Sequence, residues 1–334
     1  MMSVKKFQTM TKAIGLLSGG LDSTLAVRLM LDQGITVICL NFITPFCTCT
    51  KKGCQNQAKE MAERFNIELK IIHLKEDYIE LVKNPKYGYG KNLNPCIDCR
   101  IFMFSKARQY MVEVGAEFVF TGEVLGERPM SQNLRALKII EKESGLNGRI
   151  LRPLCARLLP PTIPEIEGIV NREKLLAIQG RSRRPQIALA RERGIDEYPC
   201  PAGGCLLTDP NFGRRLKEAF EYDEDSLIAI NLLKYGRHFR LKTGAKIIVG
   251  RNEAENKILK TIATQNNILF LELQDFPGPT ALIFNHKNGS DIEQAASLCL
   301  AYSDYKGTAP ATVKISNRDE ILATPALKQN FATI

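Results

Sequence analysis

The residues with the clearest chemical meaning lie between positions 18 and 24, in the order Ser-Gly-Gly-Leu-Asp-Ser-Thr. They follow a short apolar run, 13–17, and precede a helical pattern, 25–31, so the sequence predicts a strand, a glycine turn and a helix start. Two glycines let the backbone approach an anion closely, and the free N–H groups of a helix start point toward it. We therefore expect a phosphate-binding loop. It is not a Walker A loop, because no Gly-Lys-Ser or Gly-Lys-Thr follows.

The order SGGxDS resembles the PP-loop of the ATP pyrophosphatases, which split ATP between its α and β phosphates and adenylylate a substrate. The resemblance implies ATP and Mg²⁺ as cofactors, with Asp22 as a catalytic residue that positions the metal or the loop. The residues expected to bind the nucleotide are Ser18, Gly19, Gly20, Asp22, Ser23, Thr24, Leu40, Phe42, Thr121, Gly122 and Gln132.

Strand and helix signals alternate through the first half of the chain. Segments 35–42, 67–74 and 117–121 are typical of strands, and segments 55–65 and 100–114 are typical of helices. This alternation predicts an α/β fold with a parallel sheet, in which ligands bind beyond the carboxyl ends of the strands. We place this PP-loop ATP pyrophosphatase domain, similar to the adenine nucleotide alpha hydrolases, at residues 1–210.

The pattern of helix and strand signals changes in the rest of the chain. We expect a helical linker at 211–237 and a smaller α+β domain at 238–334, with strands at 246–249 and 268–273 around a helix near 253–265. Within it, VGRNEAEN from Val249 and DFPGP from Asp275 resemble the RNA-binding domain of the NFACT proteins. That resemblance implies an RNA partner.

Two further motifs narrow the function that we expect for the first domain. The loop after the expected fourth strand is TGEVLGERPMSQ, residues 121–132, and LRPL follows at 151–154. Together with the PP-loop they resemble the tRNA 4-thiouridine synthase family. The resemblance implies a tRNA substrate whose uridine carbonyl oxygen is adenylylated and replaced by sulfur, giving 4-thiouridine. A 2-thiouridine synthase of the sister family, and a non-catalytic Fe–S or RNA-binding protein, are the alternatives.

Seven of the ten cysteines fall into three groups: Cys47, Cys49 and Cys54; Cys96 and Cys99; Cys200 and Cys205. In a reducing compartment such groups more often bind metal or act in redox chemistry than form structural disulfides. Cys96 and Cys99 have the spacing of a chelating pair before an expected helix, whose N-terminus favours thiolates. The pair alone leaves zinc, disulfide redox and Fe–S chemistry open. The first group is expected to be spare thiols or ordinary loop residues rather than a second metal site.

The family resemblance adds a third cysteine to this pair. In both thiouridine synthase families a cysteine after a glycine-rich turn returns to the active site, and Cys205 after residues 203–204 matches that place. The resemblance implies a [4Fe-4S] cluster held by the catalytic residues Cys96, Cys99 and Cys205, with one iron open for sulfide. Cys200 lies between two prolines and is expected to be dispensable. Zinc with Cys200 as fourth ligand, and a disulfide or persulfide relay, are the alternatives.

The formal charge of +10 favours a polyanionic partner. We interpret arginines on both sides of the 200–205 loop as a contact surface for RNA phosphates; they are Arg181, Arg183, Arg184, Arg191, Arg193, Arg214 and Arg215. No apolar run reaches the ~18–20 residues of a membrane span, and the N-terminus lacks a signal-peptide core. We expect a cytoplasmic enzyme without a membrane partner, supplied with sulfur by sulfide or a cysteine desulfurase. The oligomeric state is left open, a homodimer included.

Overall fold

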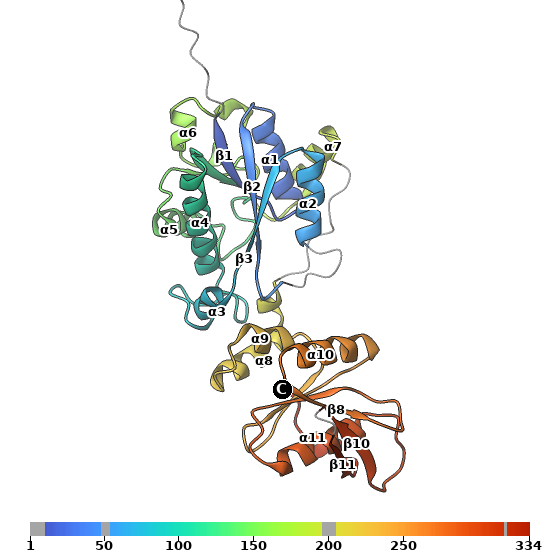
Figure 1. Ribbon diagram of the computed structural model, residues 1–334. Helices are drawn as coiled ribbons and strands as arrows, with labels where there is room; N and C mark the ends of the chain where they lie inside the picture. The colour runs from blue at the N-terminus through green and yellow to red at the C-terminus, as the bar shows by residue number, and fades with distance from the viewer. Residues whose placement is uncertain (1–10, 48–53, 196–204, 317–318) are drawn as a thin grey trace, which may run out of the picture. The chain divides into compact units, whose positions relative to one another are not determined.

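The computed structural model describes residues 11–47, 54–195, 205–316 and 319–334. The chain divides into two compact units, Met1–Thr208 and Asp209–Ile334, each with its own sheet and its own hydrophobic core (Figure 1). Among the described residues, no helix combines the length and the apolar character needed to cross a bilayer.

The sheet of the first unit is parallel throughout, which confirms the predicted α/β fold. Its five strands have the order β3-β2-β1-β4-β5. Their bounds are β1 Lys12–Leu16, β2 Thr36–Ile43, β3 Glu68–His73, β4 Phe118–Thr121 and β5 Ile150–Leu151. The chain leaves β1 toward one side of the sheet and β4 extends it on the other. The carboxyl end of β1 is therefore a topological switch point, where ligands of open α/β sheets bind.

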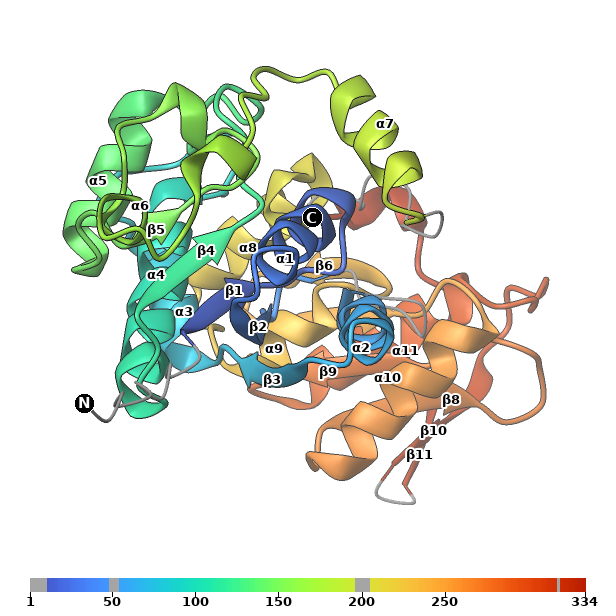
Figure 2. The same ribbon diagram turned by 90° about the horizontal axis from the view of Figure 1, so that it is seen from above.

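Helices cover both faces of this sheet. They are α1 Leu21–Leu31, α2 Cys54–Arg64, α3 Glu76–Lys83, α4 Cys96–Glu113, α5 Leu134–Ser144, α6 Ile163–Ile166 and α7 Arg184–Glu192. The apolar side chains of β1 alternate between two cores, with Ala13 in the core that includes α1, α2 and α7 and Ile14 in the core that includes α4. Figures 1 and 2 show α4 and α5 on one side of the sheet and α1 and α2 on the other.

Short 3₁₀ turns complete the first unit at Ala156–Leu158, Arg172–Lys174 and Leu206–Thr208. Residues 172–179 have a helical pattern in the sequence, but the structure forms only the second of these turns there. The chain then leaves that turn in an extended form and reaches α7, so a periodic stretch here gives one turn of helix rather than several.

The second unit is built on a six-stranded antiparallel sheet in the order β11-β10-β8-β9-β7-β6, and its α+β class is confirmed. Its strands are β6 Arg237–Arg240, β7 Lys246–Val249, β8 Leu269–Leu273, β9 Ala281–Phe284, β10 Ala311–Ile315 and β11 Glu320–Ala323. Its helices are α8 Pro210–Glu221, α9 Leu227–Leu232, α10 Glu253–Gln265 and α11 Gly289–Ala301, with a last 3₁₀ turn at Lys328–Asn330. Helices α8 and α9 occupy the segment expected as a linker and lie within this unit.

Candidate active site

The loop between β1 and α1 has the shape expected of an anion-binding turn. Gly19 has a φ of +78°, in the left-handed region that glycine favours. A Cβ atom at this position would lie 2.7 Å from Gln57 Cβ and 2.8 Å from the Ala58 nitrogen, because α2 packs directly against the turn. Gly20 precedes α1 without a side-chain cap, so the first N–H groups of α1 are left to face an anion.

The hydroxyl groups of the loop divide into two kinds. Ser23 Oγ and Thr24 Oγ1 both donate to the Gly20 carbonyl, at 2.9 and 3.0 Å, and thereby close the turn. Thr24 is fully buried, whereas Ser18 is exposed on the loop. Of the three hydroxyls, that of Ser18 is therefore best placed for a ligand, and the phosphate contacts of Ser23 and Thr24 stay predictions.

The end of β4 packs tightly on the first turn of α1. A Cβ atom on Gly122 would lie 2.4 Å from the Asp22 carbonyl carbon and 2.5 Å from the Ser23 nitrogen. Thr121 is buried beside this contact. Only glycine at position 122 permits the approach, so the TGE motif and the PP-loop form one surface.

The remaining expected nucleotide contacts have structural partners of their own. Gln132 is buried, and its side-chain oxygen accepts from the Arg128 nitrogen at 3.0 Å, which folds the loop over 126–132 back on itself. Leu40 is fully buried within β2, and Phe42 is half-buried near the end of that strand. Contact of these three residues with a nucleotide stays a prediction.

Asp22 faces several charged groups. Its Oδ2 atom lies 3.7 Å from Arg183 Nη2, and its Oδ1 atom is buried without a hydrogen-bond partner among the described residues. Burial raises the pKa of Asp22 above its usual range, while the charges of Arg183 and Arg128 oppose that shift. A carboxylate with an unsatisfied buried oxygen fits a role as ligand for a cation.

The pair Cys96 and Cys99 lies inside α4 rather than before it. The expected helix began at residue 100, but α4 starts at Cys96, so both thiols lie in its first turn. Asp98 is buried between them, and its Oδ1 accepts from the Lys86 nitrogen at 2.9 Å, which fastens the preceding loop to the helix. Burial raises the pKa of both cysteine thiols, and the Arg100 guanidinium opposes this shift.

Long-range contacts bring two more cysteines to this pair. The Leu206 nitrogen donates to the Phe46 carbonyl at 3.2 Å, so the residues next to Cys205 and Cys47 are joined. The Phe46 ring packs on Tyr78, with ring centroids 6.0 Å apart. The Tyr78 hydroxyl in turn donates to Cys99 Sγ at 2.9 Å. We call Cys47, Cys96, Cys99 and Cys205 the cysteine set.

Electrostatic effects agree with this proximity. The residue Cys205 is exposed, yet enough protein surrounds its thiol for desolvation to raise its pKa to about 12, with further contributions from Cys99, Cys47 and Cys96. The pKa of Tyr78 is raised by burial and by Cys99, Cys205 and Cys47. Sequence reasoning assigned Cys47 to a separate group of spare thiols or ordinary loop residues and did not connect it to Cys96 and Cys99.

The described part of the chain contains no set of three His, Cys, Asp or Glu side chains arranged to hold one metal ion. The structure therefore does not place Cys96, Cys99 and Cys205 as ligands of a single ion, and their role as cluster ligands stays a prediction. Cys49 and Cys200 lie outside the described residues, and Cys54 begins α2. The expected dispensability of Cys200 is therefore also still a prediction.

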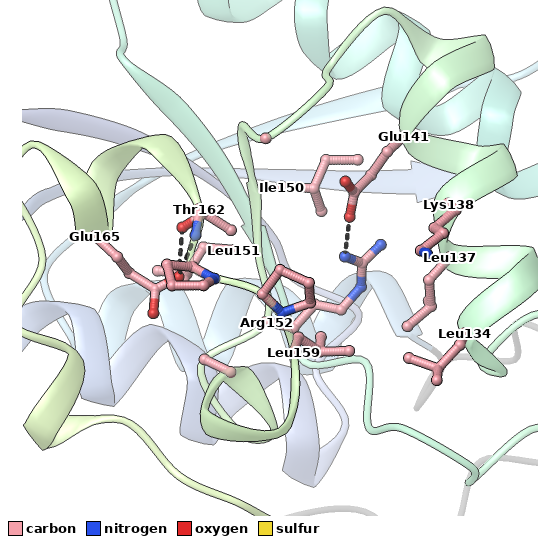
Figure 3. Close-up of a pocket in the computed structure, with 14 residues that line it drawn as sticks. Leu134, Leu137, Lys138, Glu141, Ile150, Leu151, Arg152, Leu159, Thr162 and Glu165 are labelled. Atoms are coloured by element: carbon pink, nitrogen blue, oxygen red, sulfur yellow. Dashed lines mark hydrogen bonds and ion pairs between the residues drawn. The ribbon is translucent and has the colours of Figure 1, made fainter.

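A buried ionic network joins the motifs of the first unit, and sequence reasoning missed it. Glu123 of the TGE motif lies between two arginines, with its Oε1 3.2 Å from Arg100 Nε and its Oε2 3.1 Å from Arg152 Nε. Arg152 of the LRPL motif also pairs with Glu141 at 2.5 Å, and this pair is drawn in Figure 3 beside the pocket between α5, β5 and α6. The network fixes Arg100 next to Cys99.

In the second unit, the residues resembling the NFACT pattern hold the fold together. Asn252 caps α10 by accepting from the Glu255 nitrogen at 3.0 Å, and Asn256 accepts from the Thr280 nitrogen at 3.1 Å. The charged surface lies nearby: burial lowers the pKa of Arg215, and the positive charges of Arg251 and Arg214 lower it further. Arg251 is already paired with Glu255, so Arg214 and Arg215 are the guanidinium groups here that suit a phosphate ligand.

Comparison with known proteins finds a matching family for each of the two parts of the chain. Residues 8–157 match the family described as thiamine biosynthesis protein (ThiI), and residues 236–330 match the NFACT protein RNA binding domain.

Two curated relatives illustrate the range of the matches. A probable tRNA sulfurtransferase of Thermococcus kodakarensis is 33% identical over 147 residues, which cover 44% of this chain and 37% of that protein. A tRNA-specific 2-thiouridylase MnmA of Leptospira interrogans is 30% identical over 214 residues, which cover 56% of this chain and 55% of that protein. The matches thus span about half or less of the length of these relatives.

A solved structure is similar over a larger part of the chain. The crystal structure of a 4-thiouridine synthetase–RNA complex with bound ATP is 20% identical, with a TM-score of 0.39, and the similarity covers 66% of this chain and 52% of that one.

Proposed function

We propose that this chain, whose residues 8–157 match the ThiI family and whose residues 236–330 match the NFACT protein RNA binding domain, is an ATP-dependent tRNA sulfurtransferase. The observation that carries the proposal is the joined surface of the PP-loop and Gly122, at the switch point of a parallel sheet. A chain with such a surface and a separate RNA-binding domain is equipped to activate a nucleotide within RNA.

The first step is adenylylation. The backbone N–H groups of the loop and the exposed Ser18 hydroxyl bind the phosphates of ATP, and Asp22 holds Mg²⁺ or orients the loop. The ends of β2 and β4, with Leu40, Phe42 and Thr121, flank the adenosine. The uridine carbonyl oxygen attacks the α phosphate and pyrophosphate leaves. Activation is needed because a carbonyl oxygen is a poor leaving group, whereas AMP is a good one.

In the second step, sulfide forms a bond to the activated uridine carbon, and AMP leaves with the former carbonyl oxygen. Cys96, Cys99 and Cys205 are the proposed ligands of a [4Fe-4S] cluster, which when bound supplies an iron able to hold sulfide. Thiolates are the ligands that such clusters use. The Tyr78 hydroxyl and the Arg100 guanidinium offset the negative charge that collects on these sulfurs. Burial raises the pKa of both Asp22 and Cys96, and the charge of Arg128 opposes the shift at both groups, which supports a short path between the two steps.

The proposed substrate is tRNA and the proposed product is 4-thiouridine. The arginines near Arg215 in the second unit, and the formal charge of +10, support a polyanionic partner. We propose sulfide or a cysteine desulfurase as the source of sulfur. Similarity to a 2-thiouridylase supports 2-thiouridine as the second candidate product.

The decisive test is a reconstituted reaction. The full chain, purified without oxygen and supplied with iron and sulfide, should convert ATP to AMP and pyrophosphate only when unmodified tRNA is present. Mass spectrometry of the digested tRNA should then detect 4-thiouridine. Detection of 2-thiouridine would move the reaction to the other carbonyl, and tRNA binding without AMP formation would favour a non-catalytic RNA-binding protein.

A further inference from the structure

Helix α7 lies beside α1 and runs in the same direction. Arg183 pairs with Asp22 at the N-terminal ends of the two helices, and Arg193 pairs with Asp32 at their C-terminal ends. Between these pairs, apolar side chains of both helices share one core. The positive ends of two helix dipoles therefore meet at the phosphate-binding loop.

Several buried polar atoms at this meeting point lack a partner. Among the described residues, Asp22 Oδ1, Arg183 Nε and both amide atoms of Gln186 form no hydrogen bond. Gln186 is fully buried, and its side chain lies near Asp22, where it opposes the rise that burial causes in the pKa of that carboxyl. Buried polar groups are normally satisfied, and exceptions call for a missing ligand, ion or water.

The neighbouring loop adds two more charges to the same place. The Gly180 nitrogen donates to the Leu125 carbonyl at 2.8 Å, which ties the segment before α7 to the loop after β4. That loop starts at Gly122 against Asp22 and carries Glu127 and Arg128. Burial and the Asp22 charge raise the pKa of Glu127, and the charges of Arg128 and Arg183 oppose that shift. Two carboxylates and two guanidinium groups thus share one surface.

This combination of charges selects among anions. A guanidinium group can donate two parallel hydrogen bonds to two oxygens of a phosphate, and carboxylates bind Mg²⁺. A pyrophosphate group with its Mg²⁺ satisfies both kinds of side chain. A phosphodiester of RNA carries one negative charge and would leave the two carboxylates unpaired.

We propose that Arg183 and Gln186 bind the β and γ phosphates of ATP, and that Arg183 belongs to the nucleotide site rather than to the RNA surface. The inference rests on the proposed function for the position of ATP on the PP-loop. In the reaction, the bond between the α phosphorus and its bridging oxygen breaks as the bond from the uridine oxygen forms. The electron pair stays on pyrophosphate, and Arg183 stabilises that added charge.

The test compares Arg183→Gln with Arg184→Gln, a neighbouring exposed arginine. Titration calorimetry with the full chain and Mg²⁺ measures binding of ATP, inorganic pyrophosphate and AMP, and a filter assay measures tRNA. Loss of a charged hydrogen bond predicts affinities for ATP and pyrophosphate roughly tenfold lower or more in Arg183→Gln. AMP and tRNA affinities should not change, and Arg184→Gln should bind ATP as the wild type does.

A second variant guards against a folding defect. Gln186→Met keeps the volume and removes the unpaired amide, so its melting temperature without ligand should equal or exceed that of the wild type, while the increase on adding ATP becomes smaller. Loss of tRNA affinity with normal ATP affinity in Arg183→Gln, or an equal loss of ATP and AMP, would overturn the inference. Failure of the proposed function is distinguishable: a wild type that binds ATP but never thiolates tRNA leaves the pyrophosphate site intact.

Discussion

The nucleotide-binding surface comes mainly from one continuous segment of the chain, whereas the cysteine set comes from segments far apart in the sequence. The first is a continuous loop, 17–24, whose shape follows from two glycines and a helix start, with one distant residue, Gly122, against it. The cysteine set draws on three segments: the loop after β2, the first turn of α4 and the residues from 205 on. It depends on contacts such as that between Leu206 and Phe46. A local motif can be recognised and perturbed by itself, whereas a distributed site depends on every contact that assembles it.

The largest expected effect separates the two chemistries. Cys99→Ala should abolish tRNA thiolation and iron binding, because it removes a proposed ligand and the partner of the Tyr78 hydroxyl, while tRNA-dependent AMP formation stays within a few-fold of wild type. Iron content, nucleoside mass spectrometry and AMP release measure the three quantities. Cys299→Ala, at a buried cysteine of the second unit, is the control and should retain all of them. Equal loss of AMP formation in Cys99→Ala would mean that the two sites are not separable.

The next effect concerns the nucleotide-binding surface alone. Asp22→Asn should lower the rate of AMP formation by roughly 10²–10³-fold, because it removes a charge that acts on the metal or on the loop. Iron content and tRNA affinity should stay normal. Full AMP formation by this variant would remove Asp22 from the mechanism.

A tight backbone approach gives a third test. Gly122→Ala places a Cβ atom 2.4 Å from the backbone of α1, and we expect a loss of ~1–3 kcal/mol in the free energy of unfolding from overpacking. ATP affinity should fall with it. Gly289→Ala is the matched control, because open space surrounds that glycine and, like Gly122, it does not lie in the left-handed region. Chemical denaturation compares the variants, and equal losses in both would mean that the contact with α1 is not responsible.

Because the cysteine set is assembled from distant segments, we expect thiolation to depend on contacts that lie outside the cysteines themselves. Asn92 donates to the Thr208 carbonyl at 2.7 Å and thereby holds the segment after Cys205 against the loop before α4. Asn92→Gly retains the left-handed backbone and removes this bond, which is worth about 1 kcal/mol. Thiolation should fall several-fold while ATP affinity is unchanged. Asn66→Gly, at another left-handed asparagine, is the control, and a change in ATP affinity alone would contradict the comparison.

The smallest expected effect is a pH-dependent difference in melting temperature between Asp22→Asn and the wild type. The folded-state pKa of Asp22 is raised, so its ionised form destabilises the fold, and this cost is complete once the pH exceeds that raised pKa. Without ligand, Asp22→Asn should therefore melt at a slightly higher temperature than wild type at neutral pH. The difference should vanish below the ordinary value of 3.8, where both states of the wild type are protonated. Calorimetry across this range measures it, and a lower melting temperature at neutral pH would reverse the assignment.

The sequence predicted most of the framework of the first unit. Strands expected at 35–42 and 117–121 are β2 Thr36–Ile43 and β4 Phe118–Thr121, and the helix expected at 55–65 is α2 Cys54–Arg64. Apolar periodicity suffices here because each element buries its own side chains against one sheet. Helix α3 and most strands of the second unit were not predicted, because short amphipathic segments give weak periodic signals.

The sequence by itself determined the phosphate-binding loop, since φ at Gly19 and the start of α1 are properties of adjacent residues. It also indicated Cys96, Cys99 and Cys205 as chemically special, through a resemblance. Only the tertiary structure placed Cys47 among them, joined Glu123 to Arg100 and Arg152, and set Arg183 against Asp22. These relations link residues far apart in the chain, and they are decided by the packing of helices on the sheet, which no local pattern of residues encodes.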